Sequence, residues 1–206
     1  MRLRNIKDAP NLIKASPYVI EDPKDYKSKW SEVFNNDHPI HIEIGMGKGN
    51  FIKQMALLNP DINFIGIEKY ASVLVRALEK LDEIPNLRIL LIDAKELDSV
   101  FDEEVSMIYL NHSDPWPKVR HEKRRLTSKT FLPIYEAITK DLIHIVMKTD
   151  NQGLYKYSLD SFLENNYRLI KKSNDYDDPN NILTEYETKF RNLGQVIYYL
   201  EILKVK

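Results

Sequence analysis

A short segment, residues 111–125, carries the side chains that are best suited to chemistry. It reads Asn-His-Ser-Asp-Pro-Trp-Pro-Lys-Val-Arg-His-Glu-Lys-Arg-Arg and so brings a carboxylate, an indole and two prolines together. The prolines fix φ and remove backbone donors, so they stiffen the loop and can hold a reacting group in place. Asp114 could stabilise positive charge that develops on a bound ring, whereas Trp116 could either stack on an unpaired base or pack in the interior.

A basic run follows this carboxylate. Residues 114–130 hold six Lys or Arg against two acidic side chains, a local net charge of about +4. The whole chain has a net charge of -1, so a surface for nucleic acid must come from local clustering of this kind. A basic run is usually a solvated face, but beside a reactive loop we interpret it as a phosphate-binding surface. Its titratable members are Lys118, Arg120, His121, Lys123, Arg124, Arg125 and Lys129.

A glycine-rich turn marks a second site. Glu43 begins the string Glu-Ile-Gly-Met-Gly-Lys-Gly, in which Gly45 and Gly47 let the backbone turn sharply and approach a ligand just before a helix. Glu68 follows the glycine turn by close to the roughly 20 residues at which an acidic side chain of a nucleotide site meets a pair of ribose hydroxyls. The pattern therefore favours a site for a nucleotide or nucleoside, although a turn without a ligand has the same glycines.

Acidic residues recur at the ends of the first three predicted strands. Glu43, Glu68 and Asp93 occupy these positions, where open α/β sheets bind ligands. S-adenosylmethionine carries an ammonium and a sulfonium and no phosphate, so it tolerates acidic neighbours better than a dinucleotide does. Asn50 also replaces the last glycine of the GxGxxG pattern. We therefore expect S-adenosylmethionine as the cofactor, S-adenosylhomocysteine as its product, and no metal; each acid could instead cap a helix or end a strand in solvent.

The elements that position these residues follow from the hydrophobic pattern. After Pro39, short apolar runs alternate with helical stretches, which predicts an α/β fold: a mostly parallel, twisted sheet of about seven strands with helices on both faces. The predicted strands are Ile40–Ile44, Asn63–Ile67, Leu87–Ile92, Val105–Leu110, Leu142–Met147, Tyr167–Lys171 and Gln195–Val205. The predicted helices are Asn50–Leu58, Ala71–Leu81, Ser128–Thr139, Asn151–Asn165 with Asp150 as N-cap, and a short piece at Thr184–Arg191. We expect the last strand to be antiparallel, at an edge or between neighbours, because no helix follows it.

Residues 1–39 differ from the remainder of the chain. They are polar and contain four prolines, so we interpret them as an N-terminal extension to a single domain, residues 40–206. Cysteine is absent, which removes disulfides and thiolate metal sites and fits a reducing compartment. No run approaches the roughly 20 apolar residues that span a bilayer. We therefore expect a soluble, cytoplasmic protein that does not contact a membrane.

The string at residues 110–127, LNHSDPWPKVRHEKRRLT, resembles the signature LNFSDPWPKxRHxKRRLT of the bacterial tRNA (guanine-N7)-methyltransferases. The resemblance continues through the RLRN start, EIGMGKGNF, NPDINFIGIE, residues 149–151 and residues 184–187, and so spans nearly the whole chain. It implies a Rossmann-like class I methyltransferase, monomeric or homodimeric, that methylates the guanine at position 46 in the variable loop of tRNA. His112 departs from the family, which commonly has Phe there; it could be a packed substitution or a stacking or titrating group.

The resemblance also implies roles for single residues. The positions that match donor-binding residues are Glu43, Glu68, Asp93 and Asp114. The positions that match tRNA-substrate residues are Lys118, Asp150, Thr184, Glu185, Tyr186 and Glu187, while Arg120 to Arg125 match an RNA-contacting stretch. Thr184 with Glu187 three residues on also fits a plain capping box, and capping and substrate contact can coexist.

The expected chemistry needs positioning more than proton transfer. Guanine N7 bears a lone pair and no proton, so a methyl group can arrive by direct in-line displacement. Asp114 is the predicted catalytic residue, because a fixed carboxylate would stabilise the charge that moves into the ring. It could also accept hydrogen bonds from N1 and N2 and so exclude adenine, a task that Asp150 could share. The alternatives are a methyltransferase acting on an exocyclic amine of an RNA base and a non-catalytic RNA-binding subunit.

Overall fold

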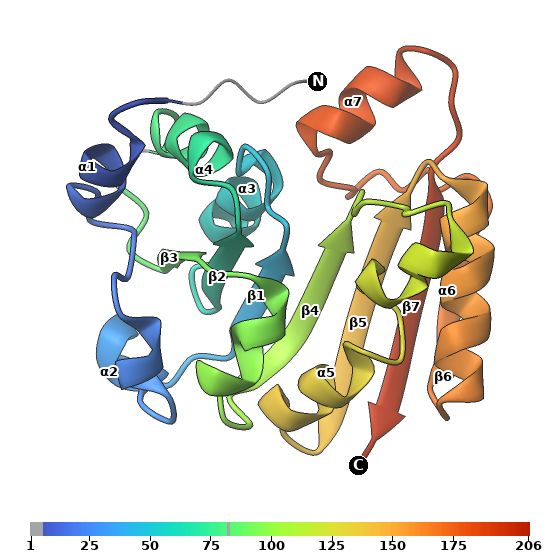
Figure 1. Cartoon of the computed structure of the whole chain (residues 1–206), viewed down its shortest axis with the longest axis horizontal. Helices are drawn as coiled ribbons and strands as arrows, with labels where there is room; N and C mark the ends of the chain where they lie inside the picture. Colours follow the sequence, from blue (N-terminus) through green and yellow to red (C-terminus); the bar gives the residue numbers. More distant parts are fainter. Residues whose placement is uncertain (1–5, 82) are drawn as a thin grey trace.

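The computed structural model describes residues 6–81 and 83–206, and within them seven strands form one sheet in the order β3-β2-β1-β4-β5-β7-β6 (Figure 1). The strands are β1 Ile40–Ile44, β2 Asn63–Glu68, β3 Leu87–Leu91, β4 Val105–Asn111, β5 Leu142–Thr149, β6 Arg168–Ser173 and β7 Tyr198–Val205. β1 to β5 pair in parallel, and β7 lies antiparallel between β5 and β6. The predicted α/β fold with an antiparallel last strand is confirmed, and the strand is internal.

The last strand is shorter than predicted because its first residues have another partner. The N–H of Gln195 donates to the carbonyl of Phe190, which closes the end of helix α7. Pairing with β5 therefore starts only at Tyr198, opposite Thr149. The other strand boundaries lie within two residues of the predicted ones.

Helices cover the sheet on both faces. The α-helices are α1 Ala9–Lys14, α2 Trp30–Phe34, α3 Asn50–Leu58, α4 Ala71–Leu78, α5 Leu132–Ile138, α6 Gln152–Glu164 and α7 Glu185–Arg191. Three short 3-10 helices are η1 Pro23–Tyr26, η2 Ala94–Ser99 and η3 Val119–Arg124. The predicted helix 128–139 was too long, because Pro133 fits only the first helical turn and α5 begins just before it.

The predicted cap of α6 was also wrong. The N-cap is Asn151, whose side chain accepts a hydrogen bond from the N–H of Leu154 at 2.8 Å. Asp150 is thereby left free for other contacts. This one-residue shift matters for the site described below.

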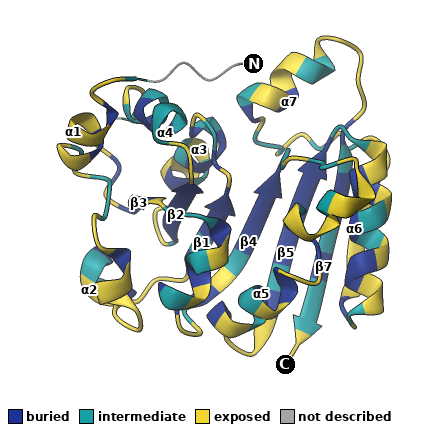
Figure 2. Cartoon of the chain, in the orientation of Figure 1, coloured by how far each residue is buried: buried dark blue, intermediate teal, exposed yellow. Residues whose placement is uncertain are grey.

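The core divides into two clusters because strand side chains alternate between the faces of the sheet. Ile42, Ile44 and Ile108 pack with α2, η2, α5 and α6, whereas Phe64 and Tyr109 pack with α1, α3 and α4 on the opposite face. β2 is buried along its whole length, and β4 and β5 are buried toward their carboxyl ends. Most exposed residues, yellow in Figure 2, lie on helices and loops. Among the described residues no helix is long and apolar enough to cross a membrane.

The segment predicted as an extension packs against the sheet where the structure describes it. Trp30 is fully buried, donates from its indole N–H to the carbonyl of Val100 at 3.0 Å, and stacks on Phe101. Two backbone hydrogen bonds also join Ile89 of β3 to Tyr18 and Ile20. The basic residues of the RLRN start lie outside the described residues. The boundary at residue 39 stays a prediction.

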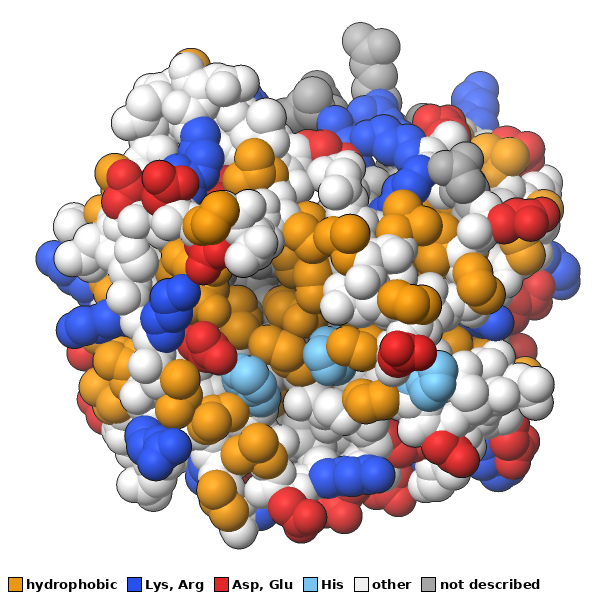
Figure 3. Space-filling model, turned by 180° about the vertical axis from the view of Figure 1, so that it is seen from behind, with side chains coloured by type: hydrophobic (Ala, Val, Ile, Leu, Met, Phe, Trp, Pro, Cys, Tyr) orange, Lys and Arg blue, Asp and Glu red, His pale blue; other side chains and the backbone are white. Residues whose placement is uncertain are grey.

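The second face of the sheet is only partly covered by helices. On that face the principal helix contacts are those of α3 and α4 with β2. Seen from behind, hydrophobic side chains and histidines surround a hollow there (Figure 3). Tyr176, from the loop before α7, stacks on Tyr199 of β7 with ring centroids 4.1 Å apart, so this loop covers part of β7.

Candidate active site

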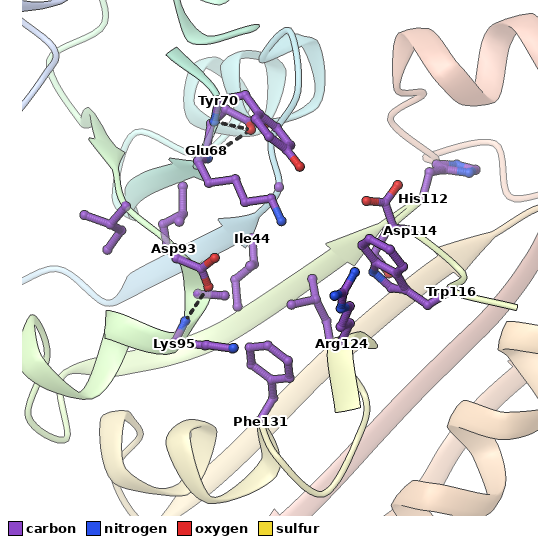
Figure 4. A pocket seen from close by; sticks show the side chains of 17 residues that line it. Ile44, Glu68, Tyr70, Asp93, Lys95, His112, Asp114, Trp116, Arg124 and Phe131 are labelled. Atoms are coloured by element: carbon purple, nitrogen blue, oxygen red, sulfur yellow. Dashed lines mark hydrogen bonds between the residues drawn. The ribbon is translucent and has the colours of Figure 1, made fainter. Parts of the chain in front are cut away.

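A cavity of about 450 Å³ opens at the carboxyl ends of β1 to β4 (Figure 4). It receives side chains from the glycine turn after β1, from the ends of β2 and β3, and from the Asp-Pro-Trp loop after β4. The residues that line it are Ile44, Gly45, Ile67, Glu68, Lys69, Tyr70, Ile92, Asp93, Ala94, Lys95, His112, Ser113, Asp114, Trp116, Arg124, Leu126 and Phe131. The two stretches singled out from the sequence therefore meet at one site.

The glycine turn has the backbone conformation that the sequence predicted. Gly45 and Gly47 have φ values of +78° and +59°, in the left-handed region that favours glycine. The N–H of Gly45 donates to the carbonyl of Ile67 at 2.8 Å, which fixes the turn against β2. A Cβ on Gly66 of β2 would collide with the sulfur of Met46, so a larger residue there would force the Met46 side chain to move. Gly45 lines the cavity, and Gly47 lies beside it.

Glu68 organises the backbone around the cavity. Its carboxylate accepts hydrogen bonds from the N–H groups of Gly47, Lys69 and Tyr70 at 3.2, 2.9 and 2.9 Å. Burial raises the pKa of Glu68, and these hydrogen bonds oppose that shift. Since both carboxylate oxygens are already held in place, the lone pairs that remain have fixed directions for a hydroxyl donor.

Asp93 combines two of the functions considered from the sequence. It lines the cavity, and it also caps η2 by accepting a hydrogen bond from the N–H of Lys95 at 3.0 Å. The backbone N–H of Asp93 donates in turn to the Glu96 carboxylate at 3.4 Å, which completes a capping box. The cap fixes the direction of the Asp93 side chain at the cavity wall.

Glu43 has a different environment from the other strand-end acids. Its side chain is on the α3 face of the sheet, 1% exposed, and it is not among the residues that line the cavity. One carboxyl oxygen accepts from the Asn111 amide at 2.8 Å, while the other has no hydrogen-bond partner among the described residues. Burial raises the pKa of Glu43 to about 8. A direct contact between Glu43 and a donor stays a prediction.

The loop after β4 holds Asp114 at the mouth of the cavity. Asp114 is exposed, and the residues on either side of it in the loop, His112 and Trp116, have φ values of +49° and +40°. Arg125 fastens the loop from below: its guanidinium donates to the carbonyls of Pro115 and Trp116 at 3.1 to 3.3 Å. Asp114 and Trp116 face the cavity from the side opposite Glu68 and Asp93 (Figure 4).

The side chains of the basic run are of two kinds: most are exposed to solvent, and others contact the protein itself. Lys118, Arg120, Lys123 and Arg124 are exposed, as expected for phosphate contact, and His121 packs its ring edge against Trp116. The Arg124 guanidinium lies 4.8 Å from the centre of the Trp116 ring and also lines the cavity. Arg125 is the exception, since it is half-buried and bonded to the protein.

The residues predicted to bind substrate from β5 and α7 lie just beyond Asp114. Asp150 Oδ1 is 3.5 Å from Nδ1 of His112, and the Tyr186 ring lies 5.1 Å from the His112 ring. Thr184 caps α7 by accepting from the N–H of Glu187 at 2.9 Å. Glu187 is fully buried and pairs with Lys148 at 2.8 Å, whereas Glu185 pairs with Lys80 at the surface. α7 therefore combines a structural anchor with exposed side chains.

Several lining residues were not predicted. Four of them directly follow the acids at the ends of β2 and β3: Lys69, Tyr70, Ala94 and Lys95. The strand-end rule, by which open α/β sheets bind ligands at the carboxyl ends of their strands, could have found them. Phe131, the N-cap of α5, gives no signal in the sequence, because it reaches the cavity only through tertiary packing.

The arrangement suits a cationic nucleoside ligand. The cavity lies in the range of roughly 300–1,000 Å³ usual for ligand sites. It offers a glycine cradle, an acid with fixed lone pairs in Glu68, a second acid in Asp93, and apolar side chains from Ile44, Ile92 and Phe131. An ammonium, a ribose and an adenine ring each find matching chemistry there. Asp114 lies across the cavity from these groups, where an acceptor can approach.

Comparisons with known proteins agree with this geometry. A family model described as a putative methyltransferase matches residues 37–200. The tRNA (guanine-N(7)-)-methyltransferase of Geobacillus sp. (strain WCH70) is 54% identical over 98% of this chain and 95% of its own length. That of Streptococcus sanguinis (strain SK36) is 50% identical over 98% of both chains. The solved structures include a mutant of the 16S rRNA (adenine(1408)-N(1))-methyltransferase from Catenulisporales acidiphilia with cosubstrate SAM. It superposes on this chain with a TM-score of 0.64 at 13% identity, covering 91% of this chain and 93% of that chain. This similarity shows the fold.

Proposed function

The chain belongs to the tRNA (guanine-N(7)-)-methyltransferase family, and we propose from this premise that it transfers a methyl group from S-adenosylmethionine to N7 of a guanine in tRNA. The observation that carries the proposal is identity of about half of all residues over nearly the full length of relatives with that activity. The guanine at position 46 and a cytoplasmic location are the finer parts of the proposal.

The chain's own residues fit the methyl donor. Glu68 would accept hydrogen bonds from the ribose hydroxyls, because its carboxylate is fixed by three backbone N–H groups. Asp93 would contact the nucleoside from the end of β3, and Gly45 would let the donor approach the backbone without a Cβ in its way. When bound, S-adenosylmethionine supplies an electrophilic methyl group on a sulfonium.

On the acceptor side, Asp114 does not need to remove a proton. Guanine N7 carries a lone pair and no hydrogen, so the protein must orient the ring and stabilise its developing positive charge. The Asp114 carboxylate, held by the loop that Arg125 anchors, is placed at the cavity mouth for both tasks. An exocyclic amine would require a group to accept its proton, and the family membership favours N7.

The exposed basic residues would bind the tRNA backbone around this mouth. Lys118, Arg120, Lys123 and Arg124 lie on one short 3-10 helix and its cap, next to Trp116. Phosphate contacts of this kind position the substrate without reading its sequence. Specificity must then come from groups that reach the guanine, for which Asp114 and Asp150 are the candidates.

A direct assay tests the methyl donor, the tRNA acceptor and the methylated atom together. The purified protein is incubated with labelled S-adenosylmethionine and tRNA from a strain that lacks the modification, and the nucleosides are separated by mass spectrometry. We expect label in N7-methylguanosine. A tRNA with adenine in place of the guanine at position 46 is the matched control for the site. Label in another nucleoside would refute guanine N7 as the methyl acceptor. Label that persists in the control tRNA would refute position 46 as the methylated site.

A further inference from the structure

His112 occupies a position with three unusual features. Its side chain is 3% exposed, and His112 lines the cavity together with Ser113 and Asp114. Its φ of +49° lies in the left-handed region, which is uncommon for a residue with a Cβ. Its backbone N–H donates to the carbonyl of Lys148 at 2.8 Å and so continues the pairing of β4 with β5. The ring is thus held at a fixed place between the active-site loop and α7.

The ring lies between two carboxylates. Nδ1 is 3.5 Å from Asp150 Oδ1, just after β5, and makes a hydrogen bond with it. Nε2 is 3.9 Å from Glu187 Oε2 on α7, an ion-pair distance, and has no hydrogen-bond partner among the described residues. An imidazolium donates from Nδ1 to Asp150 and attracts Glu187 through its charge, whereas a neutral imidazole can make only the hydrogen bond to Asp150. Tyr186, also on α7, covers the ring at 5.1 Å.

The other charges around His112 do not replace it as a partner for Asp150. Lys148 of β5 and Arg191 of α7 both pair with Glu187, at 2.8 and 3.2 Å. Asp150, by contrast, has His112 as its ion-pair partner among the described residues. The flanking loop also carries Asp114 and Lys118, and α7 also carries Glu185, Tyr186 and Lys189.

We propose that His112, as an imidazolium, is a positioning residue that ties Asp150 and α7 to the loop carrying Asp114. The inference rests on the proposed function, since Asp150 and the start of α7 are its expected substrate contacts. The bridge joins three segments that are far apart in the sequence, and α7 stands over the carboxyl ends of β4 and β5 (Figure 1). Figure 4 shows His112 and Asp114 side by side below this helix.

The electrostatics support the charged form of the bridge. Burial opposes a charge on His112, but the hydrogen bond with Asp150 and the attraction of Asp150 and Glu187 outweigh burial and raise its pKa. The same contacts lower the pKa of Asp150. The bridge is therefore complete at low pH and is lost as the pH rises through the raised pKa of His112.

The consequence is a pH-dependent affinity for tRNA. When His112 loses its proton, Asp150 keeps at most a neutral hydrogen bond, and α7 is released from one of its anchors. We expect the KM for tRNA to rise by about tenfold across this titration, the change that corresponds to one charge-assisted hydrogen bond. The turnover number at saturating tRNA should change less, since His112 does not contact the reacting atoms.

His112→Phe is the matched variant, because phenylalanine preserves an aromatic ring against Tyr186 and cannot carry charge. The ratio of KM for tRNA, variant over wild type, is measured from about pH 6 to about pH 9, a range that extends above the ordinary histidine pKa because the pKa of His112 is raised. We expect a ratio of about ten at the acidic end that falls toward one at the alkaline end. His112→Gln, a neutral donor, should give an intermediate ratio at acidic pH. A ratio that does not change with pH would overturn the proposal, because ring packing alone has no titration.

A second measurement keeps the proposal testable without activity. The chain has five histidines, so the imidazole NMR signal that disappears in His112→Phe identifies His112. We expect this signal to titrate above the ordinary pKa of 6.5, and Glu187→Gln to lower its pKa. Titration at or below 6.5 would overturn the bridge even if tRNA is methylated, and titration above 6.5 without any methylation would instead count against the proposed function.

Discussion

Substituting Arg125 by lysine tests whether this residue binds RNA or holds the active-site loop. The Nε group donates to the carbonyls of Pro115 and Trp116, and a second guanidinium nitrogen donates to Trp116 at 3.1 Å. The guanidinium carbon also lies 4.2 Å from the centre of the Tyr157 ring. Lysine preserves the charge but has no planar fork, so it can replace at most one of these donations.

The expected magnitude follows from these contacts. A hydrogen bond from a charged donor contributes about 1.5–3 kcal/mol, and the lower end applies because Arg125 is only half-buried. Two guanidinium nitrogens make these donations, and lysine can replace one of them, so losing the other costs about 1.5–2 kcal/mol in the stability of the ordered loop. If only the ordered loop places Asp114 correctly, the rate falls by about 10- to 30-fold. The loss should appear in kcat more than in the binding of tRNA.

The assay is label transfer to tRNA at several salt concentrations, with Arg124→Lys and Arg124→Ala as matched controls. Arg124 is exposed and has no hydrogen bond to the loop, so its lysine variant should retain most activity while its alanine variant weakens tRNA binding. The alanine variant should also flatten the dependence of tRNA affinity on salt concentration, by about the amount that one phosphate contact contributes. If Arg125→Lys stayed within about twofold of wild type in kcat, the anchoring argument would be refuted.

Two further predictions concern carboxylates. Asp114→Asn should lower turnover by roughly 10²–10³ with little change in the Kd for tRNA, because the lost interaction strengthens only as charge develops in the ring; equal losses in both would contradict this. Glu43 has a folded-state pKa of about 8, above its ordinary 4.5, so the unfolded chain binds fewer protons between these values and stability falls as the pH rises through this window. Glu43→Gln should remove this decrease of unfolding free energy with pH, measured by urea titration at several pH values. The same decrease in the variant as in the wild type would refute a buried, neutral Glu43.

Much of the fold could be predicted because it depends on patterns that survive in a single sequence. The alternation of short apolar runs with helical stretches identified β1 to β5 within two residues, since buried parallel strands have few other signatures. The position of β7 could not be fixed, because insertion between β5 and β6 depends on pairing across the sheet. The helices of residues 9–34 were missed because α1 and α2 are only six and five residues long, so Trp30, Val33 and Phe34 cover a single turn of apolar periodicity.

The residues that line the cavity could be predicted where they lie at strand ends, and less well where they reach it through tertiary contacts. Glu68, Asp93 and Asp114 meet at one cavity, as the strand-end rule requires. Arg125 has the same local sequence context as Arg124, yet it points into the protein. Nothing in a basic run distinguishes the two side chains, because the carbonyls that receive Arg125 are defined only when the loop folds back on itself.

The strand-end acids show how backbone periodicity divides similar residues into different chemical states. Side chains alternate along a strand, so Ile42 and Ile44 face the α5 side while Glu43 faces α3. Glu68 ends its strand where three N–H groups converge, and they oppose the effect of burial on its charge. Glu43 receives one amide donor in an otherwise closed environment, so burial determines its pKa. A carboxylate that must accept bonds from a ligand needs the first environment, which makes Glu68 the stronger candidate for the ribose and leaves Glu43 best suited to supporting the floor of the site.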